Sequence, residues 1–131
     1  MVMENTTENS KPPKDLRLRT REFAVRIISL YTVLAKSDVG RVIGRQVLRA
    51  GTSVGAQYHE GCRARSPAEF VSKLESALQE LEETQYWLAL TCDANLMSTR
   101  RLSLLQQECN ELIAIFTASV KQAKTHLKRK T

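Results

Sequence analysis

Basic side chains are grouped in this sequence, and in one group they recur at a helical interval. Arg41, Arg45 and Arg49 stand four residues apart, so a helix through them would carry one row of guanidinium groups. Clustered Arg and Lys favour a polyanion, because each phosphate that they neutralise releases counterions. The sequence therefore predicts a nucleic-acid contact made by Arg17, Arg19, Arg21, Arg41, Arg45, Arg49, Arg63, Arg65, Lys121, Lys124, Lys128, Arg129 and Lys130.

Two other interpretations of these cations stay open. They can form a solvated face paired with acidic side chains of the same chain, or they can meet an acidic surface of another protein. Neither Phe nor Trp occurs within the basic clusters. We therefore expect recognition of the backbone and shape of a nucleic acid rather than stacking on its bases.

Glycine is dense between Gly40 and Gly61, which raises the question whether this segment is a phosphate-binding loop. The spacing matches neither GxxxxGK[ST] nor GxGxxG, and no strand pattern precedes it. Gly44, Gly51 and Gly55 instead fall at steps of seven and four residues, which keeps helical phase. Because each glycine costs a helix about 1 kcal/mol relative to Ala, we expect this face to admit a closely packed neighbour.

Candidate metal ligands and acid/base pairs are few. The two histidines, His59 and His126, do not follow a Glu by three residues as in the di-iron sites of four-helix bundles. Glu60 and Glu83 are candidates for a metal-binding carboxylate pair, but a half-buried Glu paired with a cation is the favoured interpretation. We expect no catalytic residue, no metal and no cofactor, and a metal-dependent enzyme is the rival hypothesis.

Length and composition bound the class of protein. With 131 residues and 42% apolar content, we expect one domain over 15–127, between a disordered tail at 1–14 and a basic tail at 128–131. The three cysteines form no CxxC pair and no secretory signal is evident, so we expect reduced thiols in a cytoplasmic protein. No apolar run approaches the roughly 18 residues of a membrane span.

Apolar periodicity predicts four helices and no strand. We expect helices over about 15–36 and 39–63, a third from Ser66 to about Ala94, and a fourth capped by Ser98. Ser66, followed three residues later by a Glu, has the form of a capping box. Because short turns join these helices, the sequence predicts an all-α, antiparallel up-down-up-down four-helix bundle.

The same periodicity predicts the core. The first two helices should bury Leu16, Phe23, Ile27, Leu30, Tyr31, Leu34, Ile43, Val47, Ala50, Val54 and Tyr58. The last two should bury Phe70, Leu74, Ala77, Leu78, Leu81, Gln85, Leu88, Cys92, Leu102, Leu105, Cys109, Leu112, Phe116, Val120, Ala123 and Leu127. Tyr86 and Trp87 lie off these stripes, so we expect them either to contact another subunit or to pack a second face of the bundle.

Charge alternates along the chain. Residues 11–65 carry twelve basic against four acidic side chains, 66–97 carry one against six, and 98–131 carry seven against two. Antiparallel packing would place the acidic third helix between the basic second and fourth. The net charge of +6 still leaves basic surface for a polyanion.

A series of short motifs runs from position 49 to 83. It reads Arg-Ala-x-x-Ser, then Glu-Gly, then Ser-x-x-Glu-Phe, then a Leu/Ala ladder that ends in Leu-x-Glu. It is carried by Arg49, Ala50, Ser53, Glu60, Gly61, Ser66, Glu69, Phe70, Leu74, Ala77, Leu78, Leu81 and Glu83, with Gly51 and Gly55 inside it. The chain thereby resembles the four-helix-bundle proteins of 23S rRNA intervening sequences and their relatives, the accessory variability proteins of diversity-generating retroelements. It departs from them with Gly55 where Pro is usual, Gln57 where Asn is usual, and Ala64 where Arg is usual.

The resemblance implies a protomer that assembles into a homopentameric barrel with a positive surface and has no catalytic activity. The retroelement relatives bind a reverse transcriptase and the template RNA and support mutagenic reverse transcription. We therefore expect a non-catalytic scaffold for RNA, or an RNA–DNA hybrid, and a reverse transcriptase. The alternative is a 23S rRNA intervening-sequence protein with an RNA-binding or structural role, or a protein-interaction hub.

Overall fold

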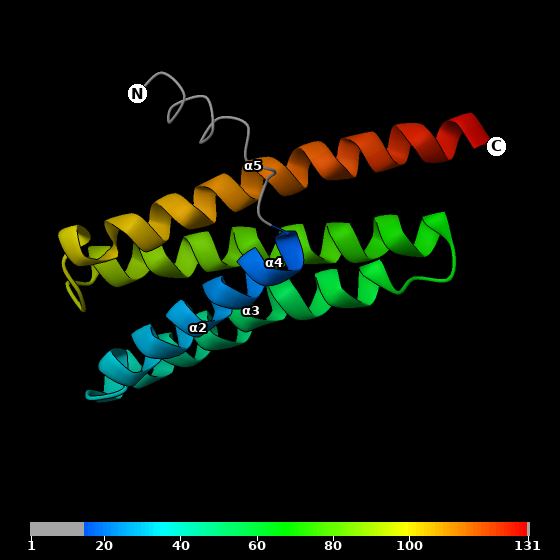
Figure 1. Cartoon of the computed structure of the whole chain (residues 1–131). Helices are drawn as coiled ribbons and strands as arrows, with labels where there is room; N and C mark the ends of the chain where they lie inside the picture. Colours follow the sequence, from blue (N-terminus) through cyan, green and yellow to red (C-terminus); the bar gives the residue numbers. More distant parts are fainter. Residues whose placement is uncertain (1–14, 131) are drawn as a thin grey trace, which may run out of the picture.

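The computed structural model describes residues 15–130, with side chains to Arg129, and is built from four helices in that range. They are α2 (Leu16–Leu34), α3 (Asp38–Cys62), α4 (Pro67–Asp93) and α5 (Thr99–Lys130) (Figure 1). This confirms the predicted all-α four-helix bundle, and the predicted bounds of the first three helices and the predicted start of the fourth lie within two residues of the observed ones. The tail predicted over 1–14 lies outside the described residues, whereas 128–130 extend α5.

Polar caps explain where the helices begin. The Ser66 hydroxyl accepts a hydrogen bond from the backbone N–H of Glu69 at 3.1 Å. The Glu69 carboxylate in turn accepts from the backbone N–H of Arg65, one residue before the cap. These bonds satisfy amide donors that lack a partner inside the first helical turn. The other three helices are capped in a similar way by Asp15, Ser37 and Ser98.

The helices run up, down, up and down, but they do not form a square bundle. α4 packs against both α3 and α5, and α2 packs against α3, whereas α2 and α5 touch at few positions. Figure 1 shows α4 and α5 continuing past the beginning of α2. Among residues 15–130, one end of the molecule is therefore built from α3, α4 and α5, and α2 does not reach it.

The core largely follows the predicted stripes. Phe23, Ile27, Leu81, Leu112 and Phe116 are among the side chains with 1% exposure or less. The prediction for Gln85 was wrong: it is exposed, and its side-chain amide donates to the Asn110 side-chain oxygen Oδ1 at 2.7 Å, linking α4 to α5.

Three buried threonines were missed by the sequence analysis. Thr20, Thr84 and Thr91 have no exposed surface, although threonine is a polar residue. Each hydroxyl donates to the carbonyl four residues earlier in its own helix, at 2.7 to 2.8 Å. Because the helix itself satisfies the hydroxyl, a small side chain can be buried between helices without an unpaired polar group.

The glycine face of α3 lies against α2, as predicted. A Cβ built on Gly51 would lie 2.7 Å from Cγ1 of Ile27, and one on Gly44 would lie 3.1 Å from the Tyr31 ring. At Gly55 the nearest atom would be the Thr20 hydroxyl at 3.2 Å. The absence of side chains along this face is what allows α2 to approach so closely.

We predict that Gly51→Ala destabilises the fold. The new methyl group meets a β-branched, fully buried Ile27, and overpacking of this kind costs about 1–3 kcal/mol. The gain in helix propensity of about 1 kcal/mol offsets only part of that cost. Urea unfolding followed by circular dichroism should show a net loss of about 1 kcal/mol, which corresponds to a few degrees in Tm.

Gly55→Ala is the matched control for this test. Its Cβ meets one hydroxyl at 3.2 Å, so the propensity gain of about 1 kcal/mol should leave stability unchanged or slightly raised. Equal destabilisation by the two variants would contradict a close-packing role that is strongest at Gly51.

Candidate nucleic-acid interface

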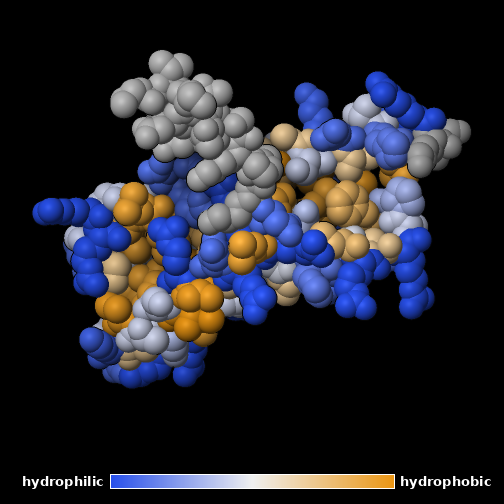
Figure 2. Space-filling view, in the orientation of Figure 1, coloured by the Kyte–Doolittle hydropathy of each residue, from blue (hydrophilic) through white to orange (hydrophobic). Residues whose placement is uncertain are grey.

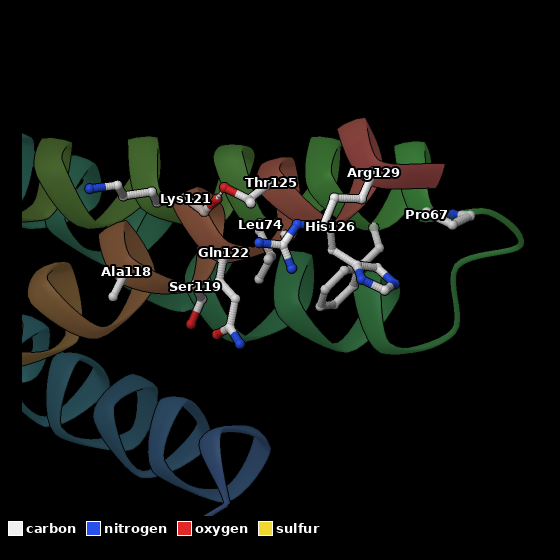
Figure 3. A pocket seen from close by; sticks show the side chains of 11 residues that line it. Pro67, Leu74, Ala118, Ser119, Lys121, Gln122, Thr125, His126 and Arg129 are labelled. Atoms are coloured by element: carbon white, nitrogen blue, oxygen red, sulfur yellow. Dashed lines mark hydrogen bonds between the residues drawn. The ribbon is translucent and has the colours of Figure 1, made fainter. Parts of the chain in front are cut away.

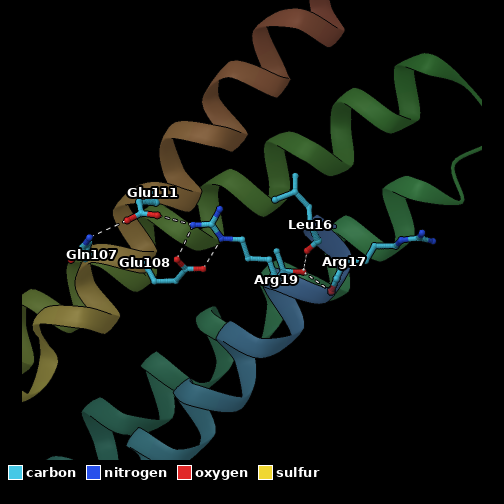
Figure 4. Close-up of polar contacts among 7 residues, drawn as sticks. Leu16, Arg17, Arg19, Gln107, Glu108 and Glu111 are labelled. Atoms are coloured by element: carbon cyan, nitrogen blue, oxygen red, sulfur yellow. Dashed lines mark hydrogen bonds and ion pairs between the residues drawn. The ribbon is translucent and has the colours of Figure 1, made fainter. Parts of the chain in front are cut away.

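Arg19 is engaged inside the bundle. Its Nε and Nη2 atoms each donate to a different Glu108 oxygen at 2.8 Å, and Nη2 also reaches Glu111 at 2.8 Å (Figure 4). The hydrogen bonds to Glu108 raise the pKa of the Arg19 guanidinium above its usual value. The Arg19 side chain is 23% exposed and that of Glu108 is 18% exposed. Arg19 therefore joins α2 to α5, and it is not available as an open phosphate contact.

The predicted row on α3 is also partly engaged. Arg49 forms ion pairs with Glu80, at 3.5 Å, and with Glu83 on α4. The same Glu83 carboxylate accepts a hydrogen bond from the Trp87 indole at 2.9 Å. Arg49 thus helps to hold α3 against α4.

Arg41 and Arg45 belong to the same row but differ in their ion pairs. Arg41 pairs with Asp38 at 3.0 Å and donates to the carbonyl of Ala35. Arg45 is exposed and has no ion pair with the described residues. The row is therefore not one uninterrupted cationic stripe.

Two other predicted cations form exposed ion pairs. Arg17 pairs with Asp15 at 3.3 Å, and Lys124 on α5 pairs with Glu75 on α4 at 2.6 Å. More than 40% of the side chain remains exposed in each partner. Such surface pairs are worth about 0–1 kcal/mol, so a polyanion can compete for these cations.

Six of the predicted cations are exposed and have no ion pair with residues 15–129. They are Arg21, Arg45, Arg63, Arg65, Lys121 and Arg129. Four of the six lie where α3 ends, α4 begins and α5 ends, and we call this end of the molecule the basic end: Arg63, Arg65, Lys121 and Arg129. The Lys130 side chain lies outside the described part of the chain.

A groove of about 740 Å³ lies at the basic end, between the start of α4 and the last turns of α5. Phe70, Leu74, Ala118 and Ala123 supply its apolar lining. Figure 3 shows the Arg129 guanidinium near Leu74, the His126 ring on the side toward Pro67, and Lys121 farther along α5. The remaining lining residues are Pro67, Ser119, Gln122 and Thr125, so no acidic side chain lines the groove.

A smaller hollow adjoins this groove. It has a volume of about 350 Å³ and is lined by Arg65 and by the turn between α3 and α4. Pro67 and Phe70 line both hollows, and no acidic side chain lines the second one either. In Figure 2, apolar surface shows beside the last part of α5, edged by hydrophilic side chains. The basic end therefore presents a hollowed apolar surface with cations around it.

Within the described part of the chain, α2 does not extend over the groove. α2 begins at Leu16, and Arg19 in its first turn reaches Glu108 and Glu111 in the middle of α5. α5 continues from there to Lys130, a rise of about 28 Å at 1.5 Å per residue. Along that length α5 packs on α4 without α2 beside it (Figure 1).

The candidate carboxylate pair does not come together. Glu60 pairs with Lys73 at 2.8 Å, whereas Glu83 lies beside Arg49. Glu60 and Arg49 are eleven positions apart on α3, about 16 Å along the helix. Among residues 15–130 no group of three or more His, Cys, Asp or Glu side chains is placed to hold a metal ion.

The remaining motif residues have structural contacts. The Ser53 hydroxyl donates to the Arg49 carbonyl at 2.7 Å. Gly61 is buried, and a Cβ there would lie 3.1 Å from that of Lys73, so this glycine admits α4. The described helices include none that is long and apolar enough to cross a membrane.

The two aromatic residues off the core stripes behave differently. Tyr86 is 58% exposed, whereas Trp87 is half-buried and packs against the core. Their rings meet edge to face, with centroids 5.0 Å apart. Trp87 thus serves the protomer itself, and the role of Tyr86 in a subunit contact stays a prediction.

Sequence reasoning missed the groove and the part that Phe70 and His126 play in it. Phe70 was predicted as a core residue at the start of α4, and the α5 cations were treated as a cluster without an aromatic. The short turn predicted between the third and fourth helices could have indicated this groove, because it makes the two helices antiparallel. It places the beginning of one helix beside the end of the other, and hence an aromatic beside the cations.

Fold and surface together define a small all-α helical bundle with a basic end. A family model described as 23S rRNA-intervening sequence protein matches residues 15–118. A crystal structure of a protein with unknown function, from the S23 ribosomal protein family of Bacteroides thetaiotaomicron, is 34% identical with a TM-score of 0.78. The match covers 82% of this chain and 99% of that one. No curated protein matches the chain.

The chain belongs to the family of 23S rRNA-intervening sequence proteins. This confirms the family resemblance that the sequence pattern indicated. The confirmation covers the family and the fold of the protomer.

We predict that Arg19→Met lowers the free energy of unfolding by about 1–2 kcal/mol. The substitution keeps the apolar stem but leaves a mostly buried Glu108 without its bidentate partner. The loss is smaller than the 3–5 kcal/mol typical of fully buried pairs, because both side chains retain some exposure. Urea unfolding of the variant measures it.

Arg21→Met is the control, since Arg21 lies two residues away on α2, is exposed and has no ion pair with the described residues. Its stability should stay within about 0.5 kcal/mol of the unsubstituted protein. If both variants lost the same stability, the division into engaged and exposed cations would be wrong.

Proposed function

We propose that this protein is a non-catalytic scaffold that binds RNA through its basic end. The observation that carries the proposal is that Arg65, Lys121 and Arg129 stand around two hollows without an acidic lining residue. A cation that forms no ion pair with the described carboxylates can release counterions when it meets a phosphate. The net charge of +6 adds long-range attraction for a polyanion.

The internal ion pairs change which residues we assign to this role. Arg19 and Arg49 connect helices, so their removal would alter the fold along with any surface charge. Arg63, Arg65, Lys121 and Arg129 can each reach a ligand at no cost to a helix contact among the described residues. The basic end is therefore favoured over the row on α3 as the principal phosphate contact.

We propose further that the protein acts within a diversity-generating retroelement, where it would bind the template RNA or an RNA–DNA hybrid and a reverse transcriptase. The alternative is an RNA-binding or structural role tied to a 23S rRNA intervening sequence, the element that the family description names. A hub that meets an acidic protein is the third candidate. Co-purification with a reverse transcriptase, before and after nuclease treatment, distinguishes these possibilities.

Assembly into a homopentamer is part of the same proposal. Exposed apolar side chains offer surface for contacts between copies: Leu18 is 48% exposed, Val25 58%, Ile28 48% and Tyr86 58%. The first three share the outer face of α2, since they stand seven and three residues apart. Light scattering of the purified protein measures the number of subunits.

We predict that a triple variant of the basic end, Arg65→Ala, Lys121→Ala and Arg129→Ala, weakens RNA binding at least about tenfold near physiological salt. Fluorescence anisotropy with a labelled single-stranded RNA measures the affinity. Repeating the titration across salt concentrations should show the slope of log K against log salt falling by about two, since roughly 0.7 counterions per single-strand phosphate are no longer released.

A control variant removes the same charge from the opposite end of the bundle. Lys36→Ala, Arg100→Ala and Arg101→Ala alter three exposed cations that have no ion pair with the described residues. This variant should keep RNA affinity within about twofold. Equal weakening by both triple variants would mean that net charge alone determines RNA affinity. Unchanged affinity in the variant of the basic end would contradict its assignment as the RNA-binding surface.

A further inference from the structure

The groove at the basic end combines cationic and apolar side chains, whereas a plain phosphate site needs only the cations. One wall carries cationic or hydrogen-bonding side chains from α5, and the floor is apolar, with Phe70 and Leu74 from α4. Phosphate groups would use the cations but leave the apolar floor exposed to water. The ligand that fits should therefore carry negative charge and a flat apolar surface within a few ångströms of each other.

We infer that this groove takes an unpaired base of single-stranded RNA, which rests on the proposed RNA-binding function and makes it more specific. In an RNA duplex the faces of the bases are stacked against one another and are not accessible to a protein side chain. An unpaired base can lay one face on the Phe70 ring, while Lys121 and Arg129 contact its flanking phosphates. Base–aromatic stacking of this type is tolerant of sequence.

The polar lining fits the edge of a base. Ser119, Gln122 and Thr125 line the groove alongside the cations. Ser119 and Gln122 each offer a donor and an acceptor, whereas the Thr125 hydroxyl donates to the Lys121 carbonyl at 3.0 Å and offers an acceptor. A base edge presents both donors and acceptors. An acidic protein segment would use the cations, but its carboxylate side chains supply only acceptors to these residues. The lining therefore favours a base over an acidic peptide.

The size of the groove agrees with this assignment. Its volume of about 740 Å³ lies within the roughly 300–1,000 Å³ of sites for small organic ligands. A base with its sugar is a ligand of that class. A docked helix is about 10 Å wide and 5.4 Å long per turn, so three turns would exceed this volume.

This inference replaces the expectation of pure backbone recognition. That expectation depended on the basic clusters holding no Phe or Trp along the sequence. In the folded chain Phe70 reaches the α5 cations from the neighbouring helix, and it lines both hollows of the basic end. Phe70 is half-buried, which leaves part of it accessible from the groove.

The test varies the ligand first, so it does not depend on any variant folding. Three labelled probes are compared by fluorescence anisotropy on the full chain: an oligouridine of about twelve nucleotides, the same strand with abasic sites, and an RNA duplex of equal length. We expect the oligouridine to bind at least about fivefold more tightly than the abasic strand, and more tightly than the duplex.

Protein variants then locate the effect. Phe70→Leu keeps an apolar side chain against the core but removes the ring, and it should abolish the preference for the oligouridine over the abasic strand. Tyr86→Leu removes an exposed aromatic ring from another face of α4 and should leave that preference unchanged. A preference that survives Phe70→Leu would overturn the assignment of this groove.

The remaining outcomes separate this inference from the function on which it rests. Equal affinity for the oligouridine and the abasic strand would overturn the base pocket but leave RNA binding in place. No affinity for any of the three probes would overturn both. Competition by polyglutamate that is as effective as competition by unlabelled oligouridine would assign the groove to an acidic protein instead.

Discussion

The close approach of α2 to α3 is the contact on which the rest of the arrangement depends. Gly44, Gly51 and Gly55 leave no side chain between the two helices, so Tyr31, Ile27 and Thr20 fill the space directly. This packing sets where α2 lies along the bundle. Because α2 begins at Leu16 and pairs with α3 there, α4 is the one described helix that packs along the last turns of α5. The open groove at the basic end is therefore a consequence of where α2 packs on α3.

Electrostatics divides the basic residues of the chain into two sets with different tasks. The acidic side chains of α4 and α5 meet Arg19, Arg49 and Lys124, and these pairs connect neighbouring helices. The acids are concentrated between 66 and 97, yet Arg63, Arg65, Lys121 and Arg129 form no side-chain ion pair with residues 15–129. The cations that remain exposed therefore gather where the bundle is also open. The exposed cations and the groove therefore lie on the same surface, although the first result from the distribution of charge and the second from the packing of the helices.

Local sequence signals predicted the elements well. These signals depend on neighbours a few residues away: the Ser66 cap, the helical phase of the α3 glycines and the near-heptad repeat of α5. Long-range facts were not accessible in the same way. That Arg19 would meet Glu108, 89 positions later, depends on the register of two helices that are not sequential. The pairing of Phe70 with the end of α5, and the exposure of Gln85 within an otherwise apolar stripe, depend on packing rather than on periodicity.

The central claim is that RNA meets this protein at the open basic end of the bundle, with a base against the floor of the groove. Ultraviolet crosslinking of a bound single-stranded RNA, followed by mass spectrometry of the crosslinked peptides, tests it most directly. The account predicts crosslinks in the peptide that contains Phe70 and in the segment of α5 around His126. Crosslinks confined to the Arg41–Arg49 row of α3, with neither of those peptides modified, would contradict it.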